Sequence, residues 1–233
     1  MKQKTVLFDL DGTLLPMDQD AFTKGYFTLL VQKLAPYGYD PAALVDNIWA
    51  GTAVMVANDG TRTNEEAFWS KLVHIYGEKV RQDIPLFDAF YREEFQQAKA
   101  FCGQNPKARE VVTACKKAGY PVVLATNPIF PAVATESRIR WAGLEPEDFA
   151  WYTTYENIGY SKPNPAYYQH ILTRLGAQAE DCLMVDEDMG AAQQAGLSVF
   201  LLTDCLINRE GKDITPYPQG DFDALMGFVQ SWA

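Results

Sequence analysis

The sequence of 233 residues is long enough for one large domain, or for a core domain with a modest insertion. Its hydrophobic content of 48% argues against a disordered chain, and its formal charge of −10 disfavours nucleic acid or an anionic membrane surface as the main partner. The cysteines show no C-x-x-C spacing, so we expect a reduced, cytoplasmic protein. No apolar run approaches the roughly 20 residues of a membrane span, and Asp9 and Asp11 interrupt the apolar run near the N-terminus, so we expect no signal peptide.

The first predicted strand covers residues 5–9 and ends in an acidic pair. Residues 6–13 read Val-Leu-Phe-Asp-Leu-Asp-Gly-Thr, so Asp9 and Asp11 stand at the end of an apolar run. Residues two apart on a strand share a face, and open α/β sheets bind ligands at the carboxyl ends of their strands. Because an unpaired acidic pair near a core costs free energy, these carboxylates indicate a bound cation or a reaction. A strand end followed by an ordinary Asp-Gly turn is the alternative for the Asp-x-Asp spacing alone.

Between about residues 18 and 100 the pattern changes to one typical of helices. No β-branched strand run appears there, and turn residues divide the stretch into about four predicted helices. Apolar side chains at three- and four-residue intervals predict one continuous helix face through Phe87, Phe90, Tyr91, Phe95 and Ala98. We expect the aromatic side chains of this stretch to be packing residues rather than a cofactor site.

From residue 105 onward, helices and strands alternate. The predicted strands are apolar runs at residues 122–125, 151–155, 182–185 and 199–203. The predicted helices cover residues 107–118, 130–142, 164–175, 188–195 and 221–232. Strands that alternate with helices imply an α/β fold with a parallel, doubly wound sheet, so the earlier helical stretch is an insertion after the first strand. We therefore assign 1–16 and 104–233 to the core and 17–103 to the insertion.

Polar residues follow two of these later segments. Thr126 and Asn127 come directly after the strand at 122–125, where a hydroxyl and nearby N–H groups suit a phosphate oxygen; a turn or a helix cap is the alternative. Lys162 lies in Ser-Lys-Pro-Asn-Pro, residues 161–165, just before a predicted helix. The prolines restrict this loop, although a lysine in a proline-rich turn is otherwise an ordinary surface residue.

Together these motifs resemble those of the haloacid dehalogenase superfamily of hydrolases, whose members have a Rossmann-like core and mostly cleave phosphate esters through an aspartyl-phosphate. The Asp-x-Asp-Gly-Thr string is similar to the family's first motif, which implies that Asp9 is the nucleophile and Asp11 the general acid/base. The resemblance further implies that Thr126 and Asn127 bind the phosphate and that Lys162, in its Lys-Pro-x-Pro context, is the third-motif lysine. The insertion would then be the family's helical cap.

The fourth motif departs from the family pattern. The family usually has a glycine and an aspartate directly after the strand, and a second aspartate at the start of the next helix. Asp188 matches the second aspartate, but the Gly-Asp half is absent and the loop after Val185 is about four residues short by comparison. Either Asp186 substitutes for the missing aspartate, or residues are missing from the printed sequence at this point. An acidic helix N-terminus favoured by the helix dipole is the plain alternative.

The resemblance implies Mg²⁺-dependent hydrolysis of a small-molecule phosphate monoester. The metal ligands would be Asp9, the backbone carbonyl of Asp11, and Asp186 or Asp188. Three other functions stay open: a sugar phosphomutase with the same intermediate, a 2-haloacid dehalogenase, and a catalytically weak binding or regulatory homologue. Asp11 argues against the dehalogenase, because that chemistry needs no acid at this position. Monomer and homodimer are equally compatible with the sequence.

Overall fold

A six-stranded parallel sheet forms the centre of the computed structural model, which describes residues 4–186, 189–206, 211 and 213–232. The strands are β1 (Thr5–Phe8), β2 (Val122–Leu124), β3 (Trp151–Tyr152), β4 (Cys182–Asp186), β5 (Ser198–Leu202) and β6 (Gln219–Gly220). Their order across the sheet is β3-β2-β1-β4-β5-β6, and all neighbouring strands are parallel. This is the doubly wound order, with its switch point between β1 and β4, so the predicted fold class is confirmed.

Helices cover both faces of the sheet because the side chains of each strand alternate. Val6 and Phe8 pack on one face and Leu7 on the other, and all three are fully buried. The first face is covered by α5 (Lys107–Lys117), α6 (Ala132–Trp141) and α9 (Phe222–Ser231). The second face is covered by α7 (Pro165–Leu175) and α8 (Gly190–Gln194). Two 3₁₀ turns, η4 (Pro146–Asp148) and η5 (Ala179–Asp181), complete this part of the fold.

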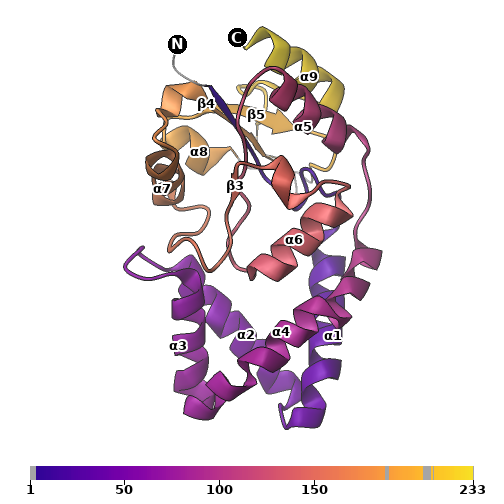
Figure 1. The fold of residues 1–233 in the computed structure, drawn as a ribbon, viewed down its shortest axis with the longest axis vertical. Coiled ribbons are helices and arrows are strands. Elements are labelled where there is room, and N and C mark those ends of the chain that lie inside the picture. The colour runs from indigo at the N-terminus through magenta and orange to yellow at the C-terminus, as the bar shows by residue number, and fades with distance from the viewer. Residues whose placement is uncertain (1–3, 187–188, 207–210, 212, 233) are drawn as a thin grey trace.

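An all-helical segment is inserted between β1 and α5. It contains α1 (Gln19–Leu34), α2 (Pro41–Val56), α3 (Asn64–Tyr76) and α4 (Ile84–Arg92), with 3₁₀ segments η1 (Ala35–Tyr37), η2 (Glu78–Asp83) and η3 (Glu94–Phe101). Figure 1 shows these helices as a layer of their own beyond one end of the sheet, in the position of a cap. Within the described ranges, no helix has the length and apolar character that a bilayer crossing requires.

The two connections between cap and core lie side by side. Met17 and Cys102 form an antiparallel bridge, and the Gly103 N–H donates to the Pro16 carbonyl at 2.6 Å. These contacts fall next to the boundaries expected from the sequence at 17 and 103, which themselves stay a prediction.

One expected helix is divided in two. Phe87 and Phe90 lie on α4, whereas Phe95 and Ala98 lie on η3, because Glu93 leaves the helical conformation with φ −110° and ψ −84°. All four apolar side chains are nevertheless buried. Apolar periodicity reports the face that residues share, and a break of one residue between two helical segments leaves that periodicity nearly intact.

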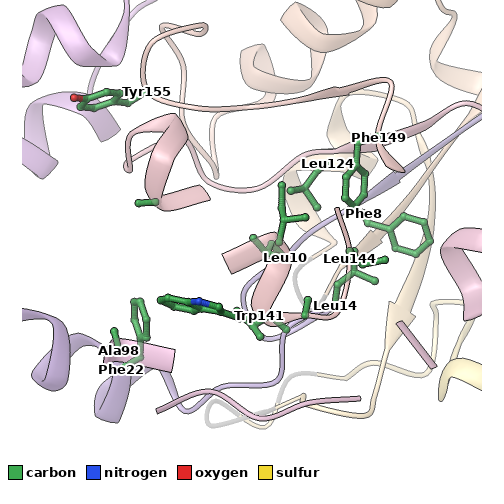
Figure 2. Close-up of a cluster of buried hydrophobic side chains, with 14 of the residues drawn as sticks. Phe8, Leu10, Leu14, Phe22, Ala98, Leu124, Trp141, Leu144, Phe149 and Tyr155 are labelled. Carbon is green, nitrogen blue, oxygen red and sulfur yellow. The ribbon is translucent and has the colours of Figure 1, made fainter. Parts of the chain in front are cut away.

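The hydrophobic core runs from the sheet into the cap without interruption. Figure 2 shows Phe8 of the sheet, Trp141 of α6, and Phe22 and Ala98 of the cap within one cluster of buried side chains. The Trp141 ring lies 5.1 Å from the ring of Phe95 in the cap. This shared packing places the cap above the carboxyl ends of the central strands.

Candidate active site

Two aspartates are neighbours at the carboxyl edge of the sheet. Phe8 of β1 is in register with Val185 of β4, and the Asp9 N–H donates to the Val185 carbonyl at 2.9 Å. The residues that follow this pair are therefore adjacent, and Asp9 and Asp186 are 6% and 3% exposed. They occupy the switch point between β1 and β4, where doubly wound sheets bind their ligands.

Lys162 connects the two carboxylates. Its Nζ donates to Asp9 Oδ1 at 2.8 Å and to Asp186 Oδ2 at 2.7 Å. The lysine lies on the loop before α7, whose N-cap residue Asn164 accepts the Ala166 N–H at 2.9 Å. The structure thus brings Lys162 to the end of β1, as its motif suggested. Asp188, the other expected acid of this edge, lies outside the described residues.

Burial and charge act against each other in this group. Burial raises the pKa of Asp9 above its ordinary value of 3.8, Lys162 opposes the rise, and Asp11 adds to it. Burial also acts to lower the pKa of Lys162, but Asp186 and Asp9 outweigh it and raise that pKa well above 10.5. Lys162 is therefore a permanent ammonium ion at neutral pH, fixed between two carboxyl groups.

A buried arginine that was not predicted from the sequence holds Asp11. Arg138 of α6 donates from Nη1 to Asp11 Oδ2, and the arginine side chain is only 1% exposed. The guanidinium also donates to Thr135 Oγ1 at 3.3 Å and lies 4.5 Å from the centre of the Phe130 ring. Asp11 Oδ1 is buried and has no hydrogen-bond partner among the described residues. One carboxyl oxygen of Asp11 is thus fixed, and the other retains its hydrogen-bonding capacity.

Thr126 and Asn127 follow β2, next to β1. The Thr126 carbonyl accepts hydrogen bonds from Thr153 Oγ1 at 2.6 Å and from the Tyr167 hydroxyl at 2.8 Å, which fixes the backbone at this turn. Asn127 Oδ1 is buried without a hydrogen-bond partner in the described part of the chain. Both residues line the same cavity as Asp9, Lys162 and Asp186. The four loops that the sequence motifs identified therefore meet at this cavity.

A second residue that the sequence analysis missed ties the cap to two of these loops. Asn64, the first residue of α3, is fully buried, and its Nδ2 donates to the Pro128 carbonyl at 3.0 Å and to Ser161 Oγ at 3.1 Å. Pro128 follows Asn127, and Ser161 precedes Lys162. Nothing in the sequence pattern pointed to this contact, because asparagine is common where a helix begins.

The site opens into a cavity of about 290 Å³ between the sheet and the cap. Most of the cap wall is aromatic and includes Phe22, Tyr26, Phe27, Phe68, Trp69 and Tyr91. These rings also pack against one another, as the Phe68 and Trp69 pair does at 5.3 Å. The cap aromatics therefore act as packing residues and, at the same time, form the wall of the cavity.

The donors at the sheet edge fit a hard cation. Asp9 and Asp186 supply carboxylate oxygens, and Mg²⁺ is often bound through one or two carboxylates with water completing the shell. In the described ranges, no group of three or more His, Cys, Asp or Glu side chains is arranged to hold a metal ion by itself. Asp9 and Asp186 share the single ammonium of Lys162, so this pair of carboxyl groups leaves room for a bound cation.

Comparisons with known proteins agree with this geometry. A family model described as haloacid dehalogenase-like hydrolase matches residues 3–196. The chain is 27% identical over 204 residues to the pyrophosphatase PpaX of Bacillus cereus (strain AH820), covering 84% of this chain and 81% of that protein. It is 24% identical over 232 residues to a phosphoglycolate phosphatase of Colwellia psychrerythraea, covering 96% and 94% of the two chains.

Solved structures share the whole architecture. A 2-haloacid dehalogenase from Pseudomonas syringae pv. tomato has a TM-score of 0.63 at 22% identity, covering 99% of this chain and all 100% of the other. The HAD-hydrolase YfnB from Bacillus subtilis, solved bound to magnesium, has a TM-score of 0.57 at 18% identity with coverage of 99% and 100%. At these identities the likeness shows the fold alone.

Proposed function

The chain belongs to the haloacid dehalogenase-like hydrolases, and from this premise we propose that it is a Mg²⁺-dependent phosphatase that hydrolyses a small-molecule phosphate monoester through an aspartyl-phosphate on Asp9. The observation that carries the proposal is the Lys162 ammonium, bonded to both Asp9 and Asp186 at the switch point of the sheet. The relatives named as a pyrophosphatase and a phosphoglycolate phosphatase support phosphoryl chemistry.

The first step is nucleophilic attack by Asp9. A carboxylate oxygen of Asp9 forms a bond to phosphorus while the bond from phosphorus to the leaving-group oxygen breaks. The Asp11 carboxyl donates its proton to that oxygen, so the leaving group departs as a neutral alcohol. Lys162 and the Thr126 and Asn127 turn hold the other phosphoryl oxygens as their charge changes.

The second step returns Asp9 to its starting form. Asp11, now a carboxylate, takes a proton from a water molecule whose oxygen forms a bond to phosphorus. The bond between phosphorus and the Asp9 oxygen breaks, which releases inorganic phosphate and leaves Asp11 protonated for the next cycle. Arg138 holds Asp11 Oδ2 through both steps, so the proton moves on the Oδ1 side.

We assign the metal to the same edge of the sheet. Asp9, the backbone carbonyl of Asp11 and Asp186 would hold Mg²⁺, and Asp188 stays a further candidate outside the described residues. When bound, the ion offsets the negative charge of the phosphoryl group and of the carboxylates around it. Asp9 and Asp186 share one ammonium, that of Lys162, so the ion would offset the negative charge that remains on this pair.

The alternatives are less well supported by the geometry. A dehalogenase uses the nucleophile alone, whereas here Asp11 has a buried arginine partner and one oxygen without a partner. A phosphomutase must hold a second phosphoryl group, and among the described residues that line the cavity Lys162 is the single cation. A regulatory homologue would show no turnover.

The test is release of inorganic phosphate from a panel of monoesters, with and without Mg²⁺. We expect release that requires the metal and is lost in Asp9→Asn, while circular dichroism shows an unchanged fold. Asp46→Asn, on the exposed side of α2, is the matched control and should retain turnover. Turnover that survives Asp9→Asn would show that the nucleophile is assigned wrongly, and no release from any ester would favour the binding homologue.

A further inference from the structure

The walls of the cavity select among phosphate esters, and this inference rests on the proposed phosphatase function. We propose that the leaving group of the substrate is an apolar group of about one ring that carries no second anionic group, so the substrate is an aryl or aralkyl phosphate rather than a phosphorylated acid or a diphosphate. Charge, wall chemistry and size each support this assignment.

The charges around the cavity exclude a second anion. Apart from the acids assigned to the phosphate site, the lining contains Asp88, and Lys162 is the single cation among the described lining residues. Lys162 already donates to two carboxylates. A carboxylate on the leaving group would lose part of its hydration in this cavity without gaining a cationic partner among the described lining residues, and burial of an unpaired charge is unfavourable.

The wall above the phosphate position is built of packed aromatic rings. Tyr26 of α1 lies 5.5 Å from Phe130 of the core, edge to face, and Trp69 of α3 lies 5.3 Å from both Phe68 and Phe87 in the same arrangement. All but Phe130 are at least nine-tenths buried. Rings held by their neighbours in this way form a preorganised apolar surface that suits another flat apolar group.

The tyrosines of the wall stay uncharged. Burial raises the pKa of Tyr26 to about 12 and the pKa of Tyr91 well above its ordinary value. Their hydroxyl groups bond to each other at 3.0 Å. These side chains therefore present apolar rings and an internally paired hydroxyl couple, and they offer no charge to an anionic group.

The volume of the cavity suits a leaving group of about one ring. An apolar cavity of about 150 Å³ is enough to hold benzene. The cavity here measures about 290 Å³, so it has space for a phosphoryl group and an organic group of about one ring. Trp49 lines the cavity yet is 51% exposed, and its ring lies 5.5 Å from that of Phe27, which places a pair of aromatic rings at the opening.

The first experiment compares kcat/KM for benzyl phosphate, ethyl phosphate, 2-phosphoglycolate and pyrophosphate with the Mg²⁺-loaded wild-type enzyme. Benzyl alcohol and glycolate are leaving groups of similar acidity, so their esters differ in how they bind rather than in intrinsic reactivity. We expect benzyl phosphate to exceed ethyl phosphate and 2-phosphoglycolate by about 100-fold. Equal or better turnover of 2-phosphoglycolate or pyrophosphate would overturn the inference while leaving the phosphatase proposal intact.

The second experiment adds a cation to the wall. Thr52 of α2 lines the cavity, and its Oγ1 donates to the Ile48 carbonyl at 3.0 Å; Thr28 of α1 makes the equivalent bond to Lys24 at 2.8 Å on the exposed surface. Thr52→Lys should raise kcat/KM for 2-phosphoglycolate about 10-fold and lower it for benzyl phosphate, and Thr28→Lys should change neither. Failure of Thr52→Lys to shift this ratio contradicts the charge argument. No phosphate release from any of the esters overturns the proposed function and this inference with it.

Discussion

Replacing Lys162 by methionine removes the ammonium that Asp9 and Asp186 share. The side chain of Lys162 is 16% exposed, and the side chains of Asp9 and Asp186, counted without their backbone atoms, are 9% and 4% exposed. Methionine keeps most of the apolar stem, so the substitution changes mainly the charge. Because loss of one partner leaves the other buried charges uncompensated, we expect the free energy of unfolding at pH 7 to fall by about 3–5 kcal/mol.

Urea unfolding in a chelating buffer measures this loss, and thermal unfolding should show a melting temperature lower by about 6–20 °C.

The stability that Lys162→Met loses should become smaller as the pH falls. A buried carboxyl whose pKa is raised in the folded state stabilises the fold when protonated, and this contribution disappears as the pH rises through the raised pKa. In the wild type, the raised pKa of Lys162 means that the lysine contributes its full stabilisation of the fold below pH 10.5. That stabilisation is lost only as the pH rises above 10.5.

Two further variants separate charge removal from general damage. Lys116→Met breaks the exposed pair between Lys116 and Asp148, which are 43% and 20% exposed, and should cost less than about 1 kcal/mol. Asp9→Asn combined with Lys162→Met should recover part of the stability, because one buried charge fewer is left without a partner. The reasoning is refuted if Lys162→Met costs no more than Lys116→Met, or if its cost is the same with Asp9→Asn present.

Three other substitutions test the roles assigned to the site. Asp11→Ala should lower kcat by roughly 10²–10⁴. The loss should be smaller for phenyl phosphate than for benzyl phosphate, because the leaving oxygen of benzyl phosphate needs the proton more. Equal losses for the two esters would count against Asp11 as the acid. Arg138→Met should lower kcat by about 10²-fold with little change in KM, because the Asp11 carboxyl loses its fixed orientation; a change confined to KM would contradict this. If the intact mass equals that of the printed sequence, Asp186→Ala should abolish activity. It should also remove the rise in melting temperature that Mg²⁺ produces by binding the native state. A mass greater by about four residues would instead assign the third ligand to the missing segment, and a chain of the printed length that stays active after Asp186→Ala would contradict the metal assignment.

Short-range patterns made the sheet and the cap predictable. The apolar runs predicted β1, β2, β4 and β5 to within one residue at each end. A strand that is buried on both faces of a sheet reads as a short, continuous apolar run, and such a run can be seen within a few residues of sequence. β6 carries no such run, because its two residues are Gln219 and Gly220, and it was not predicted. The cap helices were predictable in number, while the division between α4 and η3 was not.

The residues that complete the site were missed because their partners are distant in sequence. Arg138 is 127 residues from Asp11, and Asn64 is 64 residues from Pro128 and 97 from Ser161. Helical periodicity identifies an apolar face, and it contains no information on which buried polar side chain meets which loop. The Asp9 and Lys162 pair, 153 residues apart, was anticipated only through the resemblance of both motifs to one family.

The central claim is that Asp9 carries the phosphoryl group during turnover. Asp11→Ala with phenyl phosphate is the most favourable condition for trapping it, because this leaving group needs little protonation in the first step and the second step lacks its base. Acid quenching followed by peptide mass spectrometry should then find one phosphoryl group on the peptide that contains Asp9, and none after Asp9→Asn. Phosphate release under these conditions with no phosphorylated Asp9, or with the label on another residue, would contradict the account.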